Sequence, residues 1–242
     1  MDVTYLALIS LVGTIVGTVT GFGTSTIMIP VLLLYFPPLE AIFLVSIIHY
    51  FGDIWKVMLF REGFNWKLIA LFGVVGMIPS YIGASMSLNL DRTILLRLMG
   101  VFFIAYFVFL VFKSKFKIGV GNKTALLGGV FAGFSAGVFG LGGPIRSAVL
   151  SAFDMPKAVF IATGAVIGLM VDAARMYAYF MADTPLPSHL RWSLGLFIVL
   201  SFIGAQIGKY IVDKIPQEKF RSVIAAFLFL LGVKLVTVPV IL

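Results

Sequence analysis

Cysteine is absent from this 242-residue chain, and histidine and acidic residues are scarce. Without cysteine the chain forms no disulfide, carries no catalytic thiol and offers no thiolate to a metal. His49 and Asp53 have the spacing of metal ligands, but the second of the two histidines, His189, lies in a predicted loop. One histidine is too few for a typical catalytic zinc site, so we predict neither a metal nor another cofactor.

Charge is also sparse, since only 12% of the residues are charged while 61% are hydrophobic and the mean hydropathy is +1.11. A water-soluble fold of this length cannot bury so much apolar surface, which predicts an all-α polytopic protein embedded in a lipid bilayer. The net charge of +8 comes from lysines and arginines that lie mostly between apolar segments. The positive-inside rule explains such loops, so we expect no nucleic-acid partner.

The apolar segments predict two repeats of about five helical segments each within one membrane domain, at residues 1–117 and 118–242. The second segment of each repeat is too short to cross a bilayer, which takes about 20 helical residues. We predict that both are half-helices, either broken or re-entrant, so the fold has about 8–10 membrane segments. The expected segments are 3–20, 24–36, 40–60, 66–88 and 93–113, then 123–139, 143–154, 157–181, 190–212 and 218–239.

The halves share a pattern in which a glycine-rich break, at residues 21–25 and 137–144, is followed by an apolar run and a helix with an acid–base pair. Phe22 and Phe139, in the two breaks, are 117 residues apart, and the pairs Asp53/Lys56 and Asp172/Arg175 are 119 apart. Interrupted hydrophobic segments at matching positions of two halves are typical of the binding site of a secondary transporter.

The distribution of lysine and arginine predicts that the repeats are inverted. With five segments per half, one side of the membrane collects most of the basic residues, whereas four segments per half would remove this bias. The basic side is expected to be cytoplasmic, with the 113–123 linker inside and both termini outside. That side holds Arg61, Lys67, Lys113, Lys115, Lys117, Lys123, Lys157, Lys209, Lys214, Lys219 and Arg221, and the other holds Arg92, Arg97 and Arg191.

The two breaks are the candidate substrate site. Glycine can unwind a helix, and irregular backbone inside a membrane must line a cavity or be covered by protein. A half-helix that starts at such a break presents free N–H groups and a partial positive charge, which suit an anion. Close helix packing is the alternative role for the glycines, and snorkelling to an interface is the alternative for Arg146. The candidate residues are Gly21, Gly23, Thr24, Ser25, Gly140, Gly142, Gly143 and Arg146.

The intramembrane charges are candidates for coupling or gating. His49, Asp53 and Lys56 share one helix face, and Asp172 with Arg175 repeats the acid–base spacing. Charges are costly in hydrocarbon, so they usually mark an ion path or a partner. His49 can relay a coupling proton. Structural ion pairs, and a packing role for His49, remain alternatives.

The motifs Gly21-Phe-Gly-Thr-Ser-Thr-Ile-Met-Ile-Pro30 and Ala132-Gly-Phe-Ser-Ala-Gly-Val-Phe-Gly-Leu-Gly-Gly-Pro144 resemble the two repeats of the TauE/SafE family of sulfite exporters. The first has Thr24-Ser25-Thr26 where glycines are common. The resemblance covers essentially the whole chain. It implies secondary transport of sulfite, sulfoacetate, sulfonates or related small organic anions across a bacterial or archaeal cytoplasmic membrane.

We therefore predict a transporter rather than an enzyme, with one central site for a small anion between the two breaks. A passive anion channel is one alternative. A membrane-embedded enzyme using His49 and Asp53 as acid and base is another, although Gly140-x-Gly142-Gly143 lacks the Gly-Lys-Ser/Thr of a nucleotide-binding loop. Transport direction, coupling ion and a homo-oligomeric state stay open.

Overall fold

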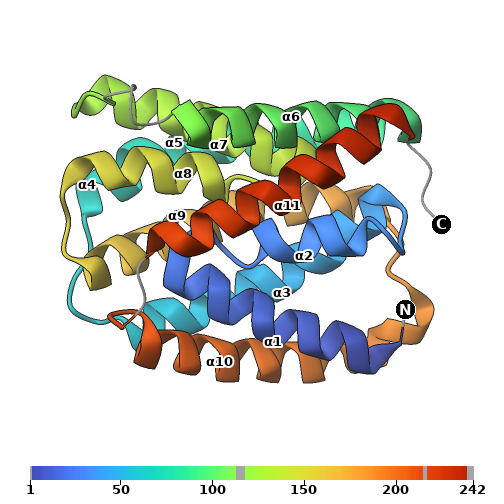
Figure 1. Cartoon of the computed structure of the whole chain (residues 1–242), viewed down its shortest axis with the longest axis horizontal. Helices are drawn as coiled ribbons and strands as arrows, with labels where there is room; N and C mark the ends of the chain where they lie inside the picture. The colour runs from blue at the N-terminus through green and yellow to red at the C-terminus, as the bar shows by residue number, and fades with distance from the viewer. Residues whose placement is uncertain (1, 113–117, 215–216, 239–242) are drawn as a thin grey trace.

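A computed structural model describes residues 2–112, 118–214 and 217–238, and this part of the chain is helical without any strand, as predicted (Figure 1). The first half contains α1 (Val3–Thr20), α2 (Ser25–Leu32), α3 (Pro38–Leu59), α4 (Trp66–Leu68), the π-helix η1 (Ile69–Val74), α5 (Val75–Leu88) and α6 (Arg92–Phe112). The second contains α7 (Asn122–Phe139), α8 (Gly143–Leu150), η3 (Ser151–Phe153), α9 (Lys157–Met181), η4 (Ser188–Ser193), α10 (Leu194–Ile211) and α11 (Gln217–Thr237).

Six helical stretches of the described residues are long and apolar enough to cross a membrane: Val3–Thr20, Pro38–Leu59, Trp66–Leu88, Arg92–Phe109, Lys157–Met181 and Ser188–Ile211. The chain is thus a multi-pass membrane protein. Helices α2 and α8 have only 8 residues each. At 1.5 Å per residue each is about 12 Å long, less than half of the hydrocarbon thickness. The two short helices expected from the sequence are therefore present.

The two halves pack against each other through several pairs of helices. Helix α1 packs on α10, and its counterpart α7 packs on α5. Helix α3 packs on α9, and α6 packs on α11. Figure 1 shows α1 and α10 lying side by side at one edge of the molecule. Because each contact joins one half to the other, the site residues on α3 and α9 are held together at the junction.

The positions of the helix ends show which residues of the two halves correspond. Helices α1 and α7 both have 18 residues, and their first residues, Val3 and Asn122, are 119 positions apart. The prolines that precede α3 and α9, Pro37 and Pro156, are also 119 apart. The spacing of 117 that Phe22 and Phe139 suggested is therefore not the structural one, because Phe139 ends α7 whereas Phe22 lies beyond the end of α1. The acid–base pairs follow the same 119-residue correspondence as the helices.

Small residues allow α5 and α7 to pack at backbone contact. A side chain on Gly133 would meet backbone atoms of Gly76, and one on Gly137 would meet the backbone of Ser80 and Ala84. The packing role thus applies to Gly137, which the sequence grouped with the second break. Such contacts are typical of membrane helices.

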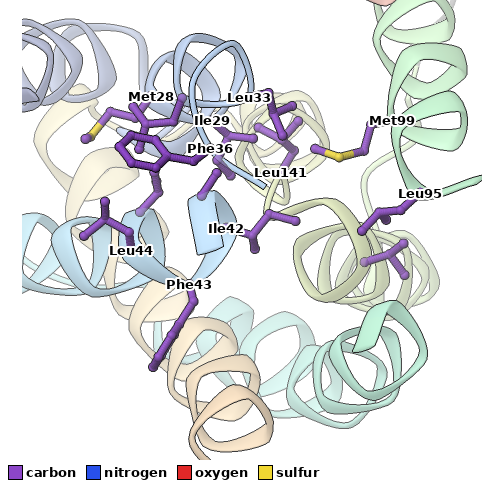
Figure 2. Packing of buried hydrophobic residues seen from close by; sticks show 14 of the residues in the cluster. Met28, Ile29, Leu33, Phe36, Ile42, Phe43, Leu44, Leu95, Met99 and Leu141 are labelled. Carbon is purple, nitrogen blue, oxygen red and sulfur yellow. The ribbon is translucent and has the colours of Figure 1, made fainter. Parts of the chain in front are cut away.

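A hydrophobic cluster supports the first half-helix. Helix α2 and its C-terminal cap bury Met28, Ile29 and Leu33 against residues of α3 such as Ile42. Figure 2 shows these side chains together with Leu141 of the second break and Met99 of α6. The cluster therefore fixes α2 against elements of both halves, and with it the position of the first break.

The inverted relation of the halves stays a prediction, and Lys115 and Leu242 at the proposed cytoplasmic linker and outer terminus lie outside the described residues. Asp2 directly precedes α1, and Lys123 is the second residue of the corresponding helix α7. If the halves are inverted, single cysteines at these two positions will react with a membrane-impermeant maleimide from opposite sides. The chain has no cysteine of its own to interfere. Labelling from the same side would show that the halves are parallel.

Candidate functional site

The two breaks have the backbone conformation that requires glycine. Gly21 ends α1 with a φ of 71°, and Gly140 ends α7 with a φ of 73°. Gly23 has a φ of 83°. These values lie in the left-handed region, which residues with a Cβ adopt at a cost. Two equivalent helices therefore end in the same way, and the chain turns into α2 and α8 from there.

The breaks meet each other in the interior. The Cα of Gly143 lies so close to the Phe22 carbonyl that any side chain at position 143 would collide with it. A side chain on Gly23 would collide with Nε2 of His49 in the same way. The close approach of backbone to backbone and backbone to imidazole is the reason why glycine occupies both positions.

Helix α8 begins at the second break and directs its N-terminus to the interior. Its first helical hydrogen bond runs from the N–H of Arg146 to the carbonyl of Gly142, at 3.0 Å. The N–H groups of Gly143 and Ile145 precede that bond, so no helical carbonyl accepts from them. They add partial positive charge beside the Arg146 side chain.

Each long helix carries an ion pair of its own. Lys56 Nζ lies 2.7 Å from Asp53 Oδ1 on α3. Arg175 Nε lies 2.9 Å from Asp172 Oδ1 on α9, and its guanidinium also donates to the Ala136 carbonyl on α7 at 3.4 Å. All four side chains are buried. The intrahelical pairing considered from the sequence is therefore present in both halves.

Further contacts join these pairs across the halves. His49 Nδ1 on α3 lies 2.5 Å from Asp172 Oδ2 on α9. Its other nitrogen, Nε2, lies 3.8 Å from Asp53 Oδ2. Arg146 Nη1 on α8 lies 3.9 Å from the same Asp53 oxygen. The structure thus brings the five predicted coupling residues and Arg146 into one buried cluster.

The ligand atoms of His49, Asp53 and Asp172 lie within 4.8 Å of one another, a spacing that a metal ion can bridge. However, Lys56, Arg146 and Arg175 already contact the two carboxylates. A divalent cation would add positive charge to a cluster in which cations outnumber carboxylates. We therefore assign these residues to the ion-pair network rather than to a metal.

Arg146 lies between two small cavities. One is lined by the second break and by α2, α3 and α9, through Ser25, Gly140, Gly142, Gly143, His49 and Asp172. The other is lined by the first break and by α3 and α9, through Gly17, Gly21, Asp53, Lys56, Phe160 and Gly164. Arg146 lines both. Each leaves about 10 Å³ for the centre of a water molecule, which is the room for about one water.

Most of the predicted substrate residues line these cavities, with two exceptions. Gly23 packs on His49 instead. The Thr24 hydroxyl points to α1, where its oxygen lies 3.4 Å from the Thr14 hydroxyl oxygen. Arg146 is only 6% exposed, so it is an interior residue and not an interface anchor.

Two residues near Arg146 were not among the site residues predicted from the sequence. Ser147, also on α8, is 1% exposed, and its hydroxyl has no hydrogen-bond partner among the described residues. Gly168 on α9 faces Asp53 and Arg146 so closely that a side chain there would collide with both. Gly164 and Gly168 are spaced four apart on α9, and this small-residue spacing was the available signal.

Breaking the α3 pair is expected to destabilise the protein. Asp53→Asn leaves Lys56 and Arg146 without their carboxylate, and loss of one partner of a buried pair costs about 3–5 kcal/mol. Adding Lys56→Met removes one unpaired cation, so the double variant should recover part of the loss but not all. Thermal unfolding in detergent, followed by tryptophan fluorescence, measures both. Glu62→Gln, at an exposed acid, is the control, and full recovery in the double variant would contradict the contact between Asp53 and Arg146.

Comparisons with known proteins give a family and one relative. The profile of the family described as Sulfite exporter TauE/SafE matches residues 5–235. A protein of Methanocaldococcus jannaschii described as a probable membrane transporter is 24% identical over an alignment of 261 positions that covers 94% of each chain. No solved structure matches the chain.

Proposed function

The chain belongs to the TauE/SafE family of membrane transporters, and from this premise we propose that it moves a small sulfur-containing or organic anion through the site between its two glycine breaks. Sulfite, sulfoacetate and simple sulfonates are the proposed substrates. The proposed location is the cytoplasmic membrane of a bacterium or archaeon. The matched relative supports the transporter role but names no substrate.

The observation that carries this proposal is the position of Arg146. It is a buried cation with cavities on both sides, and each cavity is lined by one of the two breaks. Its Nε has no hydrogen-bond partner among the described residues. A guanidinium presents a planar set of donors that matches the oxygens of a sulfonate or carboxylate. An anion that reaches either cavity can therefore bind Arg146.

The small size of the cavities favours a transporter, which opens and closes around its site, rather than a passive channel. Room for one water is too small for a sulfonate, so the described conformation is closed around the site. Binding then requires the breaks or their half-helices to move apart. Such movement of one repeat against the other around a fixed site is the mechanism of transporters built from interrupted helices.

Calorimetric binding to the purified protein tests the proposed substrate class. We expect sulfite and methanesulfonate to bind saturably at one site, whereas N-methylpyridinium, a small cation, should not bind. Binding of the cation but of neither anion would contradict the proposal. Because the site is formed by both breaks, the stoichiometry should be one anion per chain.

A further inference from the structure

The buried charges do not balance. Among the described residues, the buried acidic, basic and histidine side chains are His49, Asp53, Lys56, Arg146, Asp172 and Arg175. Three are basic side chains that contact a carboxylate, and two are the carboxylates. With His49 neutral, the cluster therefore has one positive charge in excess. Uncompensated charge inside a membrane protein is costly, which favours the binding of one negative charge there.

The excess charge can be assigned to Arg146. Asp53 and Asp172 each have a cation three residues further along their own helix. Arg146 has no acid on its own helix α8, and it shares Asp53 with Lys56 at a longer distance. Helices α2 and α8 begin 118 positions apart, at Ser25 and Gly143, so the residue of α2 that corresponds to Arg146 is Met28, a buried apolar side chain. The two halves thus match in their paired charges and differ in this one cation.

His49 is the group that can change the excess. Asp53 and Lys56 face it from its own helix α3, Asp172 and Arg175 from α9, and Arg146 from α8. Nδ1 contacts Asp172, whereas Nε2 and Asp53 Oδ2 both lack a hydrogen-bond partner although they are only 3.8 Å apart. A proton on Nε2 would supply the missing donor to Asp53. It would also raise the excess from one positive charge to two.

We propose that the site binds a singly charged anion while His49 is neutral, and that it binds a doubly charged anion only together with a proton on His49. This inference rests on the proposed function, since it specifies which charge the transported anion carries. It makes His49 a coupling residue for dianions alone. Monoanions, whose charge Arg146 already balances, would cross without a proton.

Methanesulfonate and sulfate are the matched probes, because they have the same shape and differ by one charge between pH 6 and 8. Calorimetry in buffers of different ionisation enthalpy measures how many protons are taken up on binding. We expect close to none for methanesulfonate and close to one for sulfate. Since one proton is linked to sulfate binding, the affinity for sulfate should fall by up to tenfold for each unit of rising pH.

His49→Gln tests the assignment to this residue, and His189→Gln, at the exposed second histidine, is the matched control. In His49→Gln the ratio of sulfate to methanesulfonate affinity should no longer change with pH, while in His189→Gln it should change as in the wild type. Equal proton uptake with both anions, or methanesulfonate binding without sulfate binding at pH 6, would overturn this inference and leave the proposed function intact. Failure of both anions to bind would instead count against the proposed function.

Discussion

Replacing Arg146 with glutamine is expected to weaken methanesulfonate binding by about tenfold to hundredfold. Arg146 is the buried cation without a carboxylate of its own, and both cavities reach it. Hydrogen bonds to a charged group contribute about 1.5–3 kcal/mol, which corresponds to this range of affinity. Glutamine keeps a polar side chain of moderate length, so the loss reports the charge and not a cavity. Calorimetry on the purified variant measures it.

Arg92→Gln is the matched control, because Arg92 is exposed at the start of α6. The same substitution there should leave the affinity for methanesulfonate within about twofold of wild type. If Arg146→Gln binds methanesulfonate as tightly as the control does, the guanidinium is not part of the anion site. The role of Arg146 would then be to compensate the charge of the Asp53 carboxylate, which loses one neighbouring cation in the variant.

Gly143→Ala is expected to disrupt the contact between the two breaks. The added methyl group would overlap the carbonyl of Phe22, and backbone cannot move aside as a flexible side chain can. Overpacking of a close-packed interior costs about 1–3 kcal/mol, and a backbone collision lies at the upper end. We expect the melting temperature in detergent to fall by at least about 6 °C and anion binding to be lost.

Gly195→Ala, in α10, provides the control for this change. Nothing lies within 4 Å of a Cβ built at Gly195. Alanine favours helix over glycine, so this variant should unfold at the same or a slightly higher temperature. A Gly143→Ala protein that unfolds and binds like Gly195→Ala would show that the two breaks are not in contact as the structure has them.

The sequence predicted the features that depend on local pattern. The ends of α1 and α7 at Gly21 and Gly140 were predicted because glycine can unwind a helix. The short α2 and α8 were predicted from the length of their apolar runs. The acid–base pairs on α3 and α9 followed from helical spacing. Each of these depends on neighbours within a few residues, so composition and spacing were sufficient.

Contacts between distant segments could not be predicted in this way. His49 and Asp172 are 123 residues apart, and nothing in either helix alone shows that the imidazole meets that carboxylate. Thr24 looked like a ligand at a half-helix start, but tertiary packing turned its hydroxyl towards Thr14. Ser147 was overlooked because a single serine in an apolar helix carries no signal until its surroundings are known.

Uptake into proteoliposomes is the measurement that bears most directly on transport through the site at Arg146. Vesicles with the wild-type protein should accumulate labelled methanesulfonate at a saturable initial rate, and unlabelled sulfite outside should compete. Vesicles with Arg146→Gln at the same protein density should show uptake close to that of empty vesicles at low substrate concentration. Equal, saturable uptake by the wild type and Arg146→Gln would contradict an anion path through this site.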